Sequence, residues 1–298
     1  MKLLITGAYQ WTPEQKQTLQ DLGWELIFAQ REDEPLPPAA YEAEAVVCNW
    51  LFVHQDIRRF PNLKKIQLLS AGMDRLPMEY IQQQGIEAFN ARGVYSIPMA
   101  EFALCGVLQL YRGSRTLGKN QERRCWEKQR NLMELFGKRV LVVGTGSVGT
   151  ETAKRFRAFT EEVYGVDLYP SRAEVYRQVF PLEQLDAQLA ISDVVILTLP
   201  LTEQTRGLFS AERLDKMKRG AVLVNLARGG IVDEAALLQR LESHLFGAVL
   251  DVFAAEPLPQ DSPLWDCENL ILTPHNSFVS DGNHRRMWEL IQKNLTLR

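Results

Sequence analysis

The sequence is poor in cysteine and has no long apolar run. Its four cysteines, Cys48, Cys105, Cys125 and Cys267, show no CxxC spacing and no nearby histidine pair. They therefore indicate neither a zinc site nor a disulfide framework, and we interpret them as reduced packing residues. The apolar stretch at the N-terminus is too short for a signal-peptide core or a membrane span, so we expect a cytoplasmic protein.

No single sign of charge dominates the chain. Lys and Arg total 34 against 37 Asp and Glu, a net charge of -3, and no long run of one sign is present. A run of positive charge would be needed to track the phosphates of a polymer, so nucleic acid is not an expected partner. Hydrophobic residues make up 46% of the 298 residues. That length reaches the limit of about 250–300 residues at which single cores stop growing, and it predicts two domains.

Short aliphatic runs alternate with amphipathic stretches almost from end to end, a pattern typical of βα units and mostly parallel sheets. The first set of predicted strands is 2–6, 25–28, 45–48, 65–69 and 86–89, with helices at 13–22 and 77–84. The second set is 139–143, 162–167, 193–197, 221–225, 246–250 and 270–272, and a last helix is predicted at 285–295. The fold class is α/β, with a small domain followed by a larger one.

A long apolar helix is predicted from Pro98 to about Leu117. Pro98 suits the first turn, and the apolar side of the helix is broad. Two interpretations stay open. The helix is buried against the protein's own core, or it forms a dimer interface, because an apolar helix needs cover on every side.

A dinucleotide-binding turn is indicated by Gly144, Gly146 and Gly149, which stand between an apolar strand and an amphipathic helix. That context gives GxGxxG its mechanical meaning: a tight turn, close approach of a pyrophosphate, and close helix–strand packing. Asp167 lies 23 residues after Gly144, near the spacing of about 20 at which an acid binds the adenosine ribose. A carboxylate there favours NAD over NADP, although Arg172 follows closely. The alternative is a merely structural turn with Asp167 as a cap.

Three polar residues follow predicted strands downstream of this turn: Arg228, Glu256 and His275. Ligands of open parallel sheets bind beyond the carboxyl ends of strands, so these side chains are expected to meet in one crevice. Arg228 suits a substrate carboxylate, and His275 suits the proton transfer that accompanies reduction of a 2-keto acid. Glu256 would orient the imidazole and stabilise its protonated form. Each residue taken alone also has an ordinary structural explanation.

The remaining histidines, His54, His244 and His284, are weaker candidates. None of them directly follows a strand of the nucleotide-binding half. We interpret them as surface or packing residues. No cluster of metal-ligand type is predicted.

Several blocks resemble the D-isomer-specific 2-hydroxyacid dehydrogenase family. They are Ser70–Asp74, Met99–Glu101, Gly144–Gly149, Pro200–Thr202 with Thr205, Asn225–Glu234, Asp251–Pro257 and Thr273–His275. The resemblance implies an NAD-dependent enzyme that moves a hydride between the nicotinamide and C2 of a small 2-keto or 2-hydroxy acid. It also implies that Arg228, Glu256 and His275 are the catalytic residues.

The same resemblance implies roles for further residues. Ser147 and Val148 would touch the pyrophosphate, and Pro200 and Thr205 the adenosine side; Leu226, Ala227 and Asp251 would lie near the nicotinamide, and the N–H groups of Ala71, Gly72 and Met73 would bind the substrate carboxylate.

The family architecture implies a smaller, flavodoxin-like substrate domain, discontinuous over 1–93 and 276–298, around a Rossmann-type, doubly wound NAD-binding domain at 94–275. Catalysis would take place in the cleft between the two. Dimerisation through the helix after Pro98 is the family norm, so a homodimer is expected.

Two segments depart from the family pattern. Where phosphoglycerate-specific relatives carry an Arg-Ser pair, this chain has Cys48–Phe52, which lacks the phosphate-binding cation and disfavours a phosphorylated substrate. Residues 276–279, Asn-Ser-Phe-Val, replace an expected run of small residues.

Two alternative functions stay open. One is an NAD-sensing, corepressor-like binding protein. The other is oxidation of formate, against which Glu256 argues because formate-oxidising relatives carry a neutral amide there.

Overall fold

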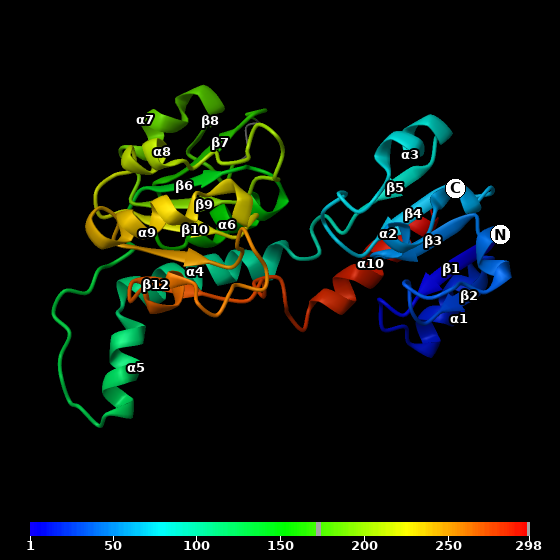
Figure 1. The fold of residues 1–298 in the computed structure, drawn as a ribbon, viewed down its shortest axis with the longest axis horizontal. Helices are drawn as coiled ribbons and strands as arrows, with labels where there is room; N and C mark the ends of the chain where they lie inside the picture. Colours follow the sequence, from blue (N-terminus) through cyan, green and yellow to red (C-terminus); the bar gives the residue numbers. More distant parts are fainter. Residues whose placement is uncertain (171–173, 297–298) are drawn as a thin grey trace. The chain divides into compact units, whose positions relative to one another are not determined.

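The chain divides into two compact units in a computed structural model that describes residues 1–170 and 174–296 (Figure 1). Unit 1 comprises Met1–Tyr95 and the C-terminal segment from Ser280, and unit 2 comprises Ser96–Val279. The sequence analysis had placed the boundaries after residues 93 and 275. Each unit has its own parallel sheet and its own apolar clusters.

The sheet of unit 1 has five parallel strands in the order β2-β1-β3-β4-β5. They are β1 (Lys2–Thr6), β2 (Glu25–Ala29), β3 (Ala45–Cys48), β4 (Lys65–Leu68) and β5 (Glu87–Phe89). This is the flavodoxin-like order, whose topological switch point lies between the first and third strands. All five strands were predicted from the sequence to within one residue at either end.

Helices cover both faces of this sheet, so its central strands are continuously apolar rather than alternating. They are α1 (Pro13–Asp21), α2 (Leu51–His54), α3 (Met78–Gln84) and α10 (Asn283–Thr296), with short 3-10 turns η1 (Pro38–Glu42) and η2 (Ile57–Arg59). The α1 helix begins at a capping box in which Thr12 and Gln15 satisfy each other's backbone N–H groups.

The C-terminal helix α10 returns to unit 1 although it follows unit 2 in sequence. Met287, Ile291 and Leu295 occur once per helical turn and pack in one cluster with Leu3 and Ile5 of β1. Figure 1 shows this red helix beside the blue strands. The apolar stripe of α10 is thus buried against the sheet of unit 1. For this reason unit 1 is made of two separate segments of the chain.

The sheet of unit 2 has seven parallel strands in the order β12-β11-β10-β9-β6-β7-β8. They are β6 (Val140–Val143), β7 (Val163–Asp167), β8 (Gln178–Pro181), β9 (Val194–Leu197), β10 (Val222–Asn225), β11 (Gly247–Leu250) and β12 (Leu270–Leu272). The order is doubly wound about β6, as in a Rossmann fold, which confirms the predicted fold class. Only β8 was missed, because it is a short edge strand that ends in proline.

The helices of unit 2 surround this sheet, except α5, which follows α4 and has no buried residue. They are α4 (Ser96–Tyr111), α5 (Ser114–Glu122), α6 (Ser147–Phe156), α7 (Leu185–Leu189), α8 (Ala211–Asp215) and α9 (Glu234–Ser243), with turns η3 (Leu182–Gln184), η4 (Gly229–Ile231) and η5 (Pro263–Asp266).

The single helix predicted from Pro98 to Leu117 is wrong. The chain forms two helices, α4 and α5, which are separated at Gly113. Gly113 has φ 61, in the left-handed region that ends a helix and that glycine adopts without steric cost. The apolar positions end at Tyr111 and only Leu117 follows within the predicted range, so Gly113 was a stop signal that the sequence analysis passed over.

The apolar face of α4 belongs to the core of unit 2. A Cβ on Gly106 would lie 2.7 Å from Cγ1 of Val249 in β11, so helix and sheet approach each other closely there. Ala103, Val107 and Tyr111 are buried in the same cluster as β10 and β11 side chains. Of the two interpretations left open for this helix, burial in the protein's own core accounts for that face.

All four cysteines are free thiols. Cys48 is buried and Cys267 half-buried, as packing residues are. Cys105 and Cys125 are exposed, so their assignment as packing residues is wrong: the α4 position of Cys105 faces away from the sheet, and Cys125 follows α5. Among the described residues, no helix combines the length and the apolar character needed to cross a bilayer.

Candidate active site

The glycine turn lies between β6 and α6, at the carboxyl edge of the unit 2 sheet. Gly144 has φ 98, and a Cβ there would lie 2.8 Å from the backbone nitrogen of Leu199. A Cβ on Gly149 would lie 2.0 Å from the carbonyl oxygen of Gly144. Both positions therefore demand glycine, one for the turn and one for the contact between helix and strand.

The first turn of α6 is built to receive an anion. Gly146 is the N-cap, and open space surrounds the position of a Cβ on it. The N–H groups of Ser147, Val148 and Gly149 open the helix, where they have no intrahelical acceptor. The residues present thus fit a dinucleotide pyrophosphate, which needs close backbone approach and N–H donors.

Asp167 ends β7, the strand beside β6, and its carboxylate reaches the glycine turn. Oδ2 accepts hydrogen bonds from the backbone nitrogen (2.6 Å) and the hydroxyl (3.0 Å) of Thr145, and Oδ1 accepts one from the nitrogen of Tyr169 (3.0 Å). Asp167 therefore holds the turn as well as standing where the ribose ligand is expected. Arg172, which bears on the choice between NAD and NADP, lies outside the described residues.

The loop after β9 is closed by its own side chains. The Thr205 hydroxyl donates to the carbonyl oxygen of Pro200 at 2.7 Å and accepts from the nitrogen of Thr202 at 2.7 Å. Thr198, which the sequence analysis did not single out, donates from its hydroxyl to the carbonyl oxygen of Gly144 at 2.6 Å. This loop and the glycine turn follow adjacent strands, so one edge of the sheet presents both.

His275 and Glu256 are in direct contact. Nδ1 of His275 lies 2.8 Å from Oε2 of Glu256, and both side chains are partly exposed. Oε1 of Glu256 accepts from the nitrogen of Phe253 at 2.9 Å, so the carboxylate is held at both oxygens. The predicted pairing of acid and imidazole is thus present in the structure.

A buried carboxylate organises the segment that carries His275. Asp251 is 0% exposed and accepts from the Thr273 hydroxyl (2.6 Å) and from the nitrogens of Asn276 (2.7 Å) and Ser277 (3.0 Å). His275 itself has φ 52, which side chains with a Cβ rarely adopt, and its nitrogen donates to the carbonyl oxygen of Asp251. Such a conformation persists where surrounding contacts over-determine it.

Arg228 follows β10, the neighbour of β11, at the same edge of the sheet. Its side chain is exposed and Nη1 donates to the carbonyl oxygen of Ala227 at 2.7 Å. Asn225 supports the turn by donating to the carbonyl oxygen of Arg228 and accepting from the nitrogen of Ala227. A Cβ on Gly229 would lie 1.9 Å from the carbonyl carbon of Phe253, so the loops after β10 and β11 touch.

Leu226 and Ala227 have buried side chains, 1% and 6% exposed, in two different apolar clusters. Any contact of these two residues with a nicotinamide would therefore come from their backbone atoms. Phe278 lies in the segment that departs from the family pattern. Its ring meets the His275 imidazole edge-on, with centroids 6.0 Å apart, a contact that the sequence analysis missed.

In unit 1, three consecutive carbonyl groups of the loop after β4 accept hydrogen bonds. The oxygens of Ala71, Gly72 and Met73 accept from the Asn90 amide, the Ser70 hydroxyl and the Leu76 nitrogen, respectively. Within the described part of the chain, the N–H groups of these three residues donate no hydrogen bond. Three backbone donors in one loop suit a carboxylate.

Two charged residues that the sequence analysis did not single out stand at the same edge of unit 1. Glu32 is buried and accepts from the Thr6 hydroxyl and from the nitrogens of Asn49 and Trp50. Arg75 donates to Oδ1 of Asn49, and its guanidinium stacks on the Trp50 ring, 3.6 Å from the centroid. His275 was identified by searching for polar residues that follow strands. Arg75 also follows a strand, but it belongs to no recognised motif.

A glycine turn for a dinucleotide and a carboxylate–imidazole pair, both at the carboxyl edge of one doubly wound sheet, are typical of a nicotinamide-dependent dehydrogenase. The chain belongs to the D-isomer specific 2-hydroxyacid dehydrogenase family, whose NAD-binding domain matches residues 104–277. It is an NAD-dependent oxidoreductase of that family. The predicted family, enzyme class and cofactor are thereby confirmed.

Three comparisons illustrate the relationship. Glyoxylate reductase from Thermofilum pendens is 37% identical over 79% of this chain and 71% of its own length. (S)-sulfolactate dehydrogenase from Chromohalobacter salexigens is 36% identical over 78% and 76%. A D-isomer specific 2-hydroxyacid dehydrogenase from Xanthobacter autotrophicus Py2, solved with NADPH and MES, is 33% identical with a TM-score of 0.81 and covers 99% of this chain and 93% of its own. These relatives support the dehydrogenase and not the corepressor-like alternative.

Proposed function

We propose that this enzyme interconverts a small 2-keto acid and its D-2-hydroxy acid, with Arg228, Glu256 and His275 as its catalytic residues. The observation that carries the proposal is the 2.8 Å contact between Glu256 and His275 at the sheet edge that Arg228 shares. When bound, NADH supplies the hydride, and the protein supplies placement and charge.

His275 handles the proton. Because Nδ1 faces the Glu256 carboxylate, Nδ1 keeps its hydrogen and Nε2 is the nitrogen that gains and loses one. In reduction, Nε2 donates a proton to the oxygen on C2 of the substrate, and in oxidation it accepts one. Glu256 holds the ring in this orientation through the contact with Nδ1.

Arg228 and the loop Ala71–Met73 hold the substrate. The guanidinium cannot lose its charge at working pH and suits the planar carboxylate and the polarised carbonyl of a 2-keto acid. The N–H groups of Ala71, Gly72 and Met73 add backbone donors for the carboxylate. The role is supported by the absence of any hydrogen bond donated by these three N–H groups within the described part of the chain.

Several residues are proposed to bind the cofactor. Gly144, Gly146, Ser147, Val148 and Gly149 would hold the pyrophosphate, Pro200 and Thr205 the adenosine side, and Leu226, Ala227 and Asp251 the surroundings of the nicotinamide. Asp167 would bind the adenosine ribose and favour NADH over NADPH, because a carboxylate repels a 2′-phosphate.

Steady-state rates test this function. Purified protein is offered a panel of 2-keto acids with NADH and with NADPH, and oxidation of the cofactor is followed by absorbance. We expect turnover with NADH and a loss of most of the rate in Arg228→Ala. Arg219→Ala, an exposed arginine of the same unit, is the matched control and should retain the rate. Flat absorbance across the whole panel would contradict the proposal.

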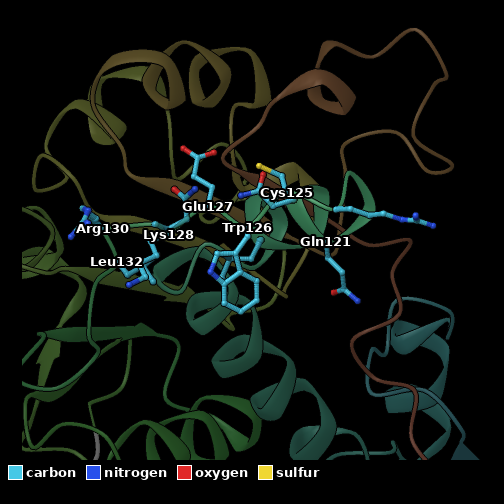
Figure 2. Close-up of a pocket in the computed structure, with 11 residues that line it drawn as sticks. Gln121, Cys125, Trp126, Glu127, Lys128, Arg130 and Leu132 are labelled. Carbon is cyan, nitrogen blue, oxygen red and sulfur yellow. The ribbon is translucent and has the colours of Figure 1, made fainter.

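We further propose that the enzyme is a homodimer whose contact includes α5 and the segment after it. Residues 125–134 have no regular secondary structure, and Trp126 is 97% exposed. Trp126 is one of the residues that line the hollow between this segment and α5 (Figure 2). A large aromatic side chain so exposed in a folded chain is typical of a contact surface.

Light scattering after gel filtration tests the dimer. Trp126→Asp should lower the measured mass toward that of one chain, while Trp265→Asp, a half-exposed tryptophan elsewhere in unit 2, should leave it unchanged. A monomeric native protein would contradict the proposal.

A cytoplasmic location also stays a prediction, which fractionation of producing cells tests.

A further inference from the structure

Arg75 is held in a fixed place at the carboxyl edge of the unit 1 sheet. Its Nη1 donates to Oδ1 of Asn49 at 2.5 Å, and its guanidinium carbon lies 3.6 Å from the centroid of the Trp50 ring. Asn49 and Trp50 follow β3, while Arg75 follows β4, and these two strands are paired. The contact therefore joins two neighbouring strand-end loops.

Asn49 and Trp50, which contact Arg75, are fixed in turn by a buried carboxylate. Glu32, which follows β2 and is buried, accepts from the nitrogens of both Asn49 and Trp50, and Thr6 at the end of β1 donates its hydroxyl to the same carboxylate. A stacked and hydrogen-bonded guanidinium loses less entropy when it binds an anion than a mobile one. The Arg75 guanidinium is therefore preorganised to bind an anion.

Arg75 also lies in the loop that carries the proposed substrate donors. The N–H groups of Ala71, Gly72 and Met73 precede it by two to four positions. The sequence analysis noted that Cys48–Phe52 lacks the phosphate-binding cation of phosphoglycerate-specific relatives. That segment has no cation of its own, but Arg75 of the next loop contacts its Asn49 and Trp50.

We propose that Arg75 determines substrate specificity by binding a second oxyanion group, so that the preferred substrates are 2-keto acids with a carboxylate, sulfonate or phosphate beyond C2. The proposal rests on the proposed function and names its substrate class. All three groups share coplanar or tripodal oxygens that match the donor fork of arginine. Asn49 and Trp50 act as positioning residues.

The test compares substrates of similar length with and without the second charge. 2-Oxobutyrate carries one negative charge, whereas oxaloacetate, 3-sulfopyruvate and 3-phosphohydroxypyruvate carry a further oxyanion. kcat/KM is measured with NADH for the native enzyme, Arg75→Leu, Arg75→Lys and Arg59→Leu. Arg59 is the matched control, because it also stacks on an aromatic ring in unit 1, 3.9 Å from the Tyr41 centroid, but it precedes β4 instead of following it.

We expect the native enzyme to prefer at least one of the doubly charged substrates. Arg75→Leu should lower kcat/KM for that substrate about tenfold to a hundredfold, the range for a lost charge-assisted hydrogen bond, with 2-oxobutyrate changed less than threefold. Arg75→Lys should restore part of the preference, and Arg59→Leu should leave it intact. The substrate that responds most identifies whether the group is a carboxylate, a sulfonate or a phosphate.

Trp50 supplies a second readout. Trp50→Phe keeps an aromatic face beneath the guanidinium and should retain the preference, whereas Trp50→Ala should raise KM for the doubly charged substrate and leave kcat nearly unchanged. An equal loss of kcat/KM for every substrate in Trp50→Ala would indicate a merely structural role.

Three outcomes would overturn the inference. In the first, the native enzyme has the same kcat/KM for 2-oxobutyrate and for the doubly charged acids. In the second, Arg75→Leu changes kcat/KM for no substrate. In the third, Arg75→Leu lowers kcat/KM equally for all substrates, because Arg75 binds the carboxylate that they share. In each case 2-keto acids are still reduced, so the proposed function survives. Absence of turnover with every 2-keto acid would instead refute the proposed function itself.

Discussion

The two sheets carry the same device at their carboxyl edges. Asp251 in unit 2 is 0% exposed and Glu32 in unit 1 is 8% exposed. Each carboxylate accepts one threonine hydroxyl and two backbone N–H groups from the loops around it. A buried carboxylate must be fully hydrogen-bonded, so each holds its loops rigidly.

The two carboxylates differ in what they position. Asp251 holds the segment that carries His275, a group proposed to transfer a proton, whereas Glu32 holds Asn49 and Trp50, which in turn hold Arg75. If the proposed roles of His275 and Arg75 hold, the comparison teaches that the chemistry of the reaction and the choice of substrate depend on separate buried carboxylates. Asp251 belongs to a recognisable block of the sequence, and Glu32 belongs to none.

The largest effect on the rate is expected from His275, which lies on the segment that Asp251 holds. His275→Gln should lower kcat about 10²- to 10⁴-fold, because a general acid of this kind contributes that much. Steady-state kinetics on the best substrate measure it. His244→Gln is the control, since His244 contacts the carbonyl oxygen of Met217 in the same unit and lies outside the site. Equal losses in both variants would remove His275 from the mechanism.

Changing the support itself should have a smaller effect on the rate. Asp251→Asn replaces one accepting oxygen with an NH₂ group that faces a donor. The mismatch should cost about 1–3 kcal/mol in the free energy of unfolding and lower kcat for every substrate. Denaturant unfolding and kinetics with singly and doubly charged acids measure both effects. A native rate would show that the loop needs no such support.

The matching change in unit 1 sharpens the contrast. Glu32→Gln should cost a similar amount, about 1–3 kcal/mol, because it also leaves a backbone donor facing an amide. Its kinetic effect should be confined to doubly charged substrates, through Arg75. If Glu32→Gln lowered the rate with 2-oxobutyrate as much as Asp251→Asn does, the division between the two supports would be wrong.

An exposed carboxylate should contribute least. The hydrogen bond from Lys216 lowers the pKa of Asp186, and Arg213 acts in the same direction against the effect of burial. A lowered pKa stabilises the fold above the unfolded value of about 3.9, and this stabilisation is lost as pH falls through the folded value. Since Asp186 is 37% exposed, Asp186→Asn should cost at most about 1 kcal/mol at pH 7. Unfolding at pH 7 and pH 3 checks that the difference shrinks.

The sequence analysis succeeded where local pattern and local chemistry coincide. Strands buried on both faces are short aliphatic runs, so eleven of the twelve strands were predicted and only the edge strand β8 was missed. The glycine turn was predictable because Gly144 and Gly149 sit where a Cβ would collide with backbone. The break at Gly113 was missed although the apolar positions end at Tyr111, because residues 114–117 still permit a helix and the prediction ran on to Leu117.

The sequence by itself determined the fold class, the family, the cofactor and the identity of the proposed catalytic residues, since each rests on residue types at fixed spacing along the chain. Only the tertiary structure decided that Glu256 contacts His275, that Asp251 is buried beneath that pair's loop, and that Arg75 lies on Trp50. The reason is physical: parallel strands bring together loops that are far apart in the chain. A contact between Arg75 and Asn49 exists only once β3 and β4 are paired.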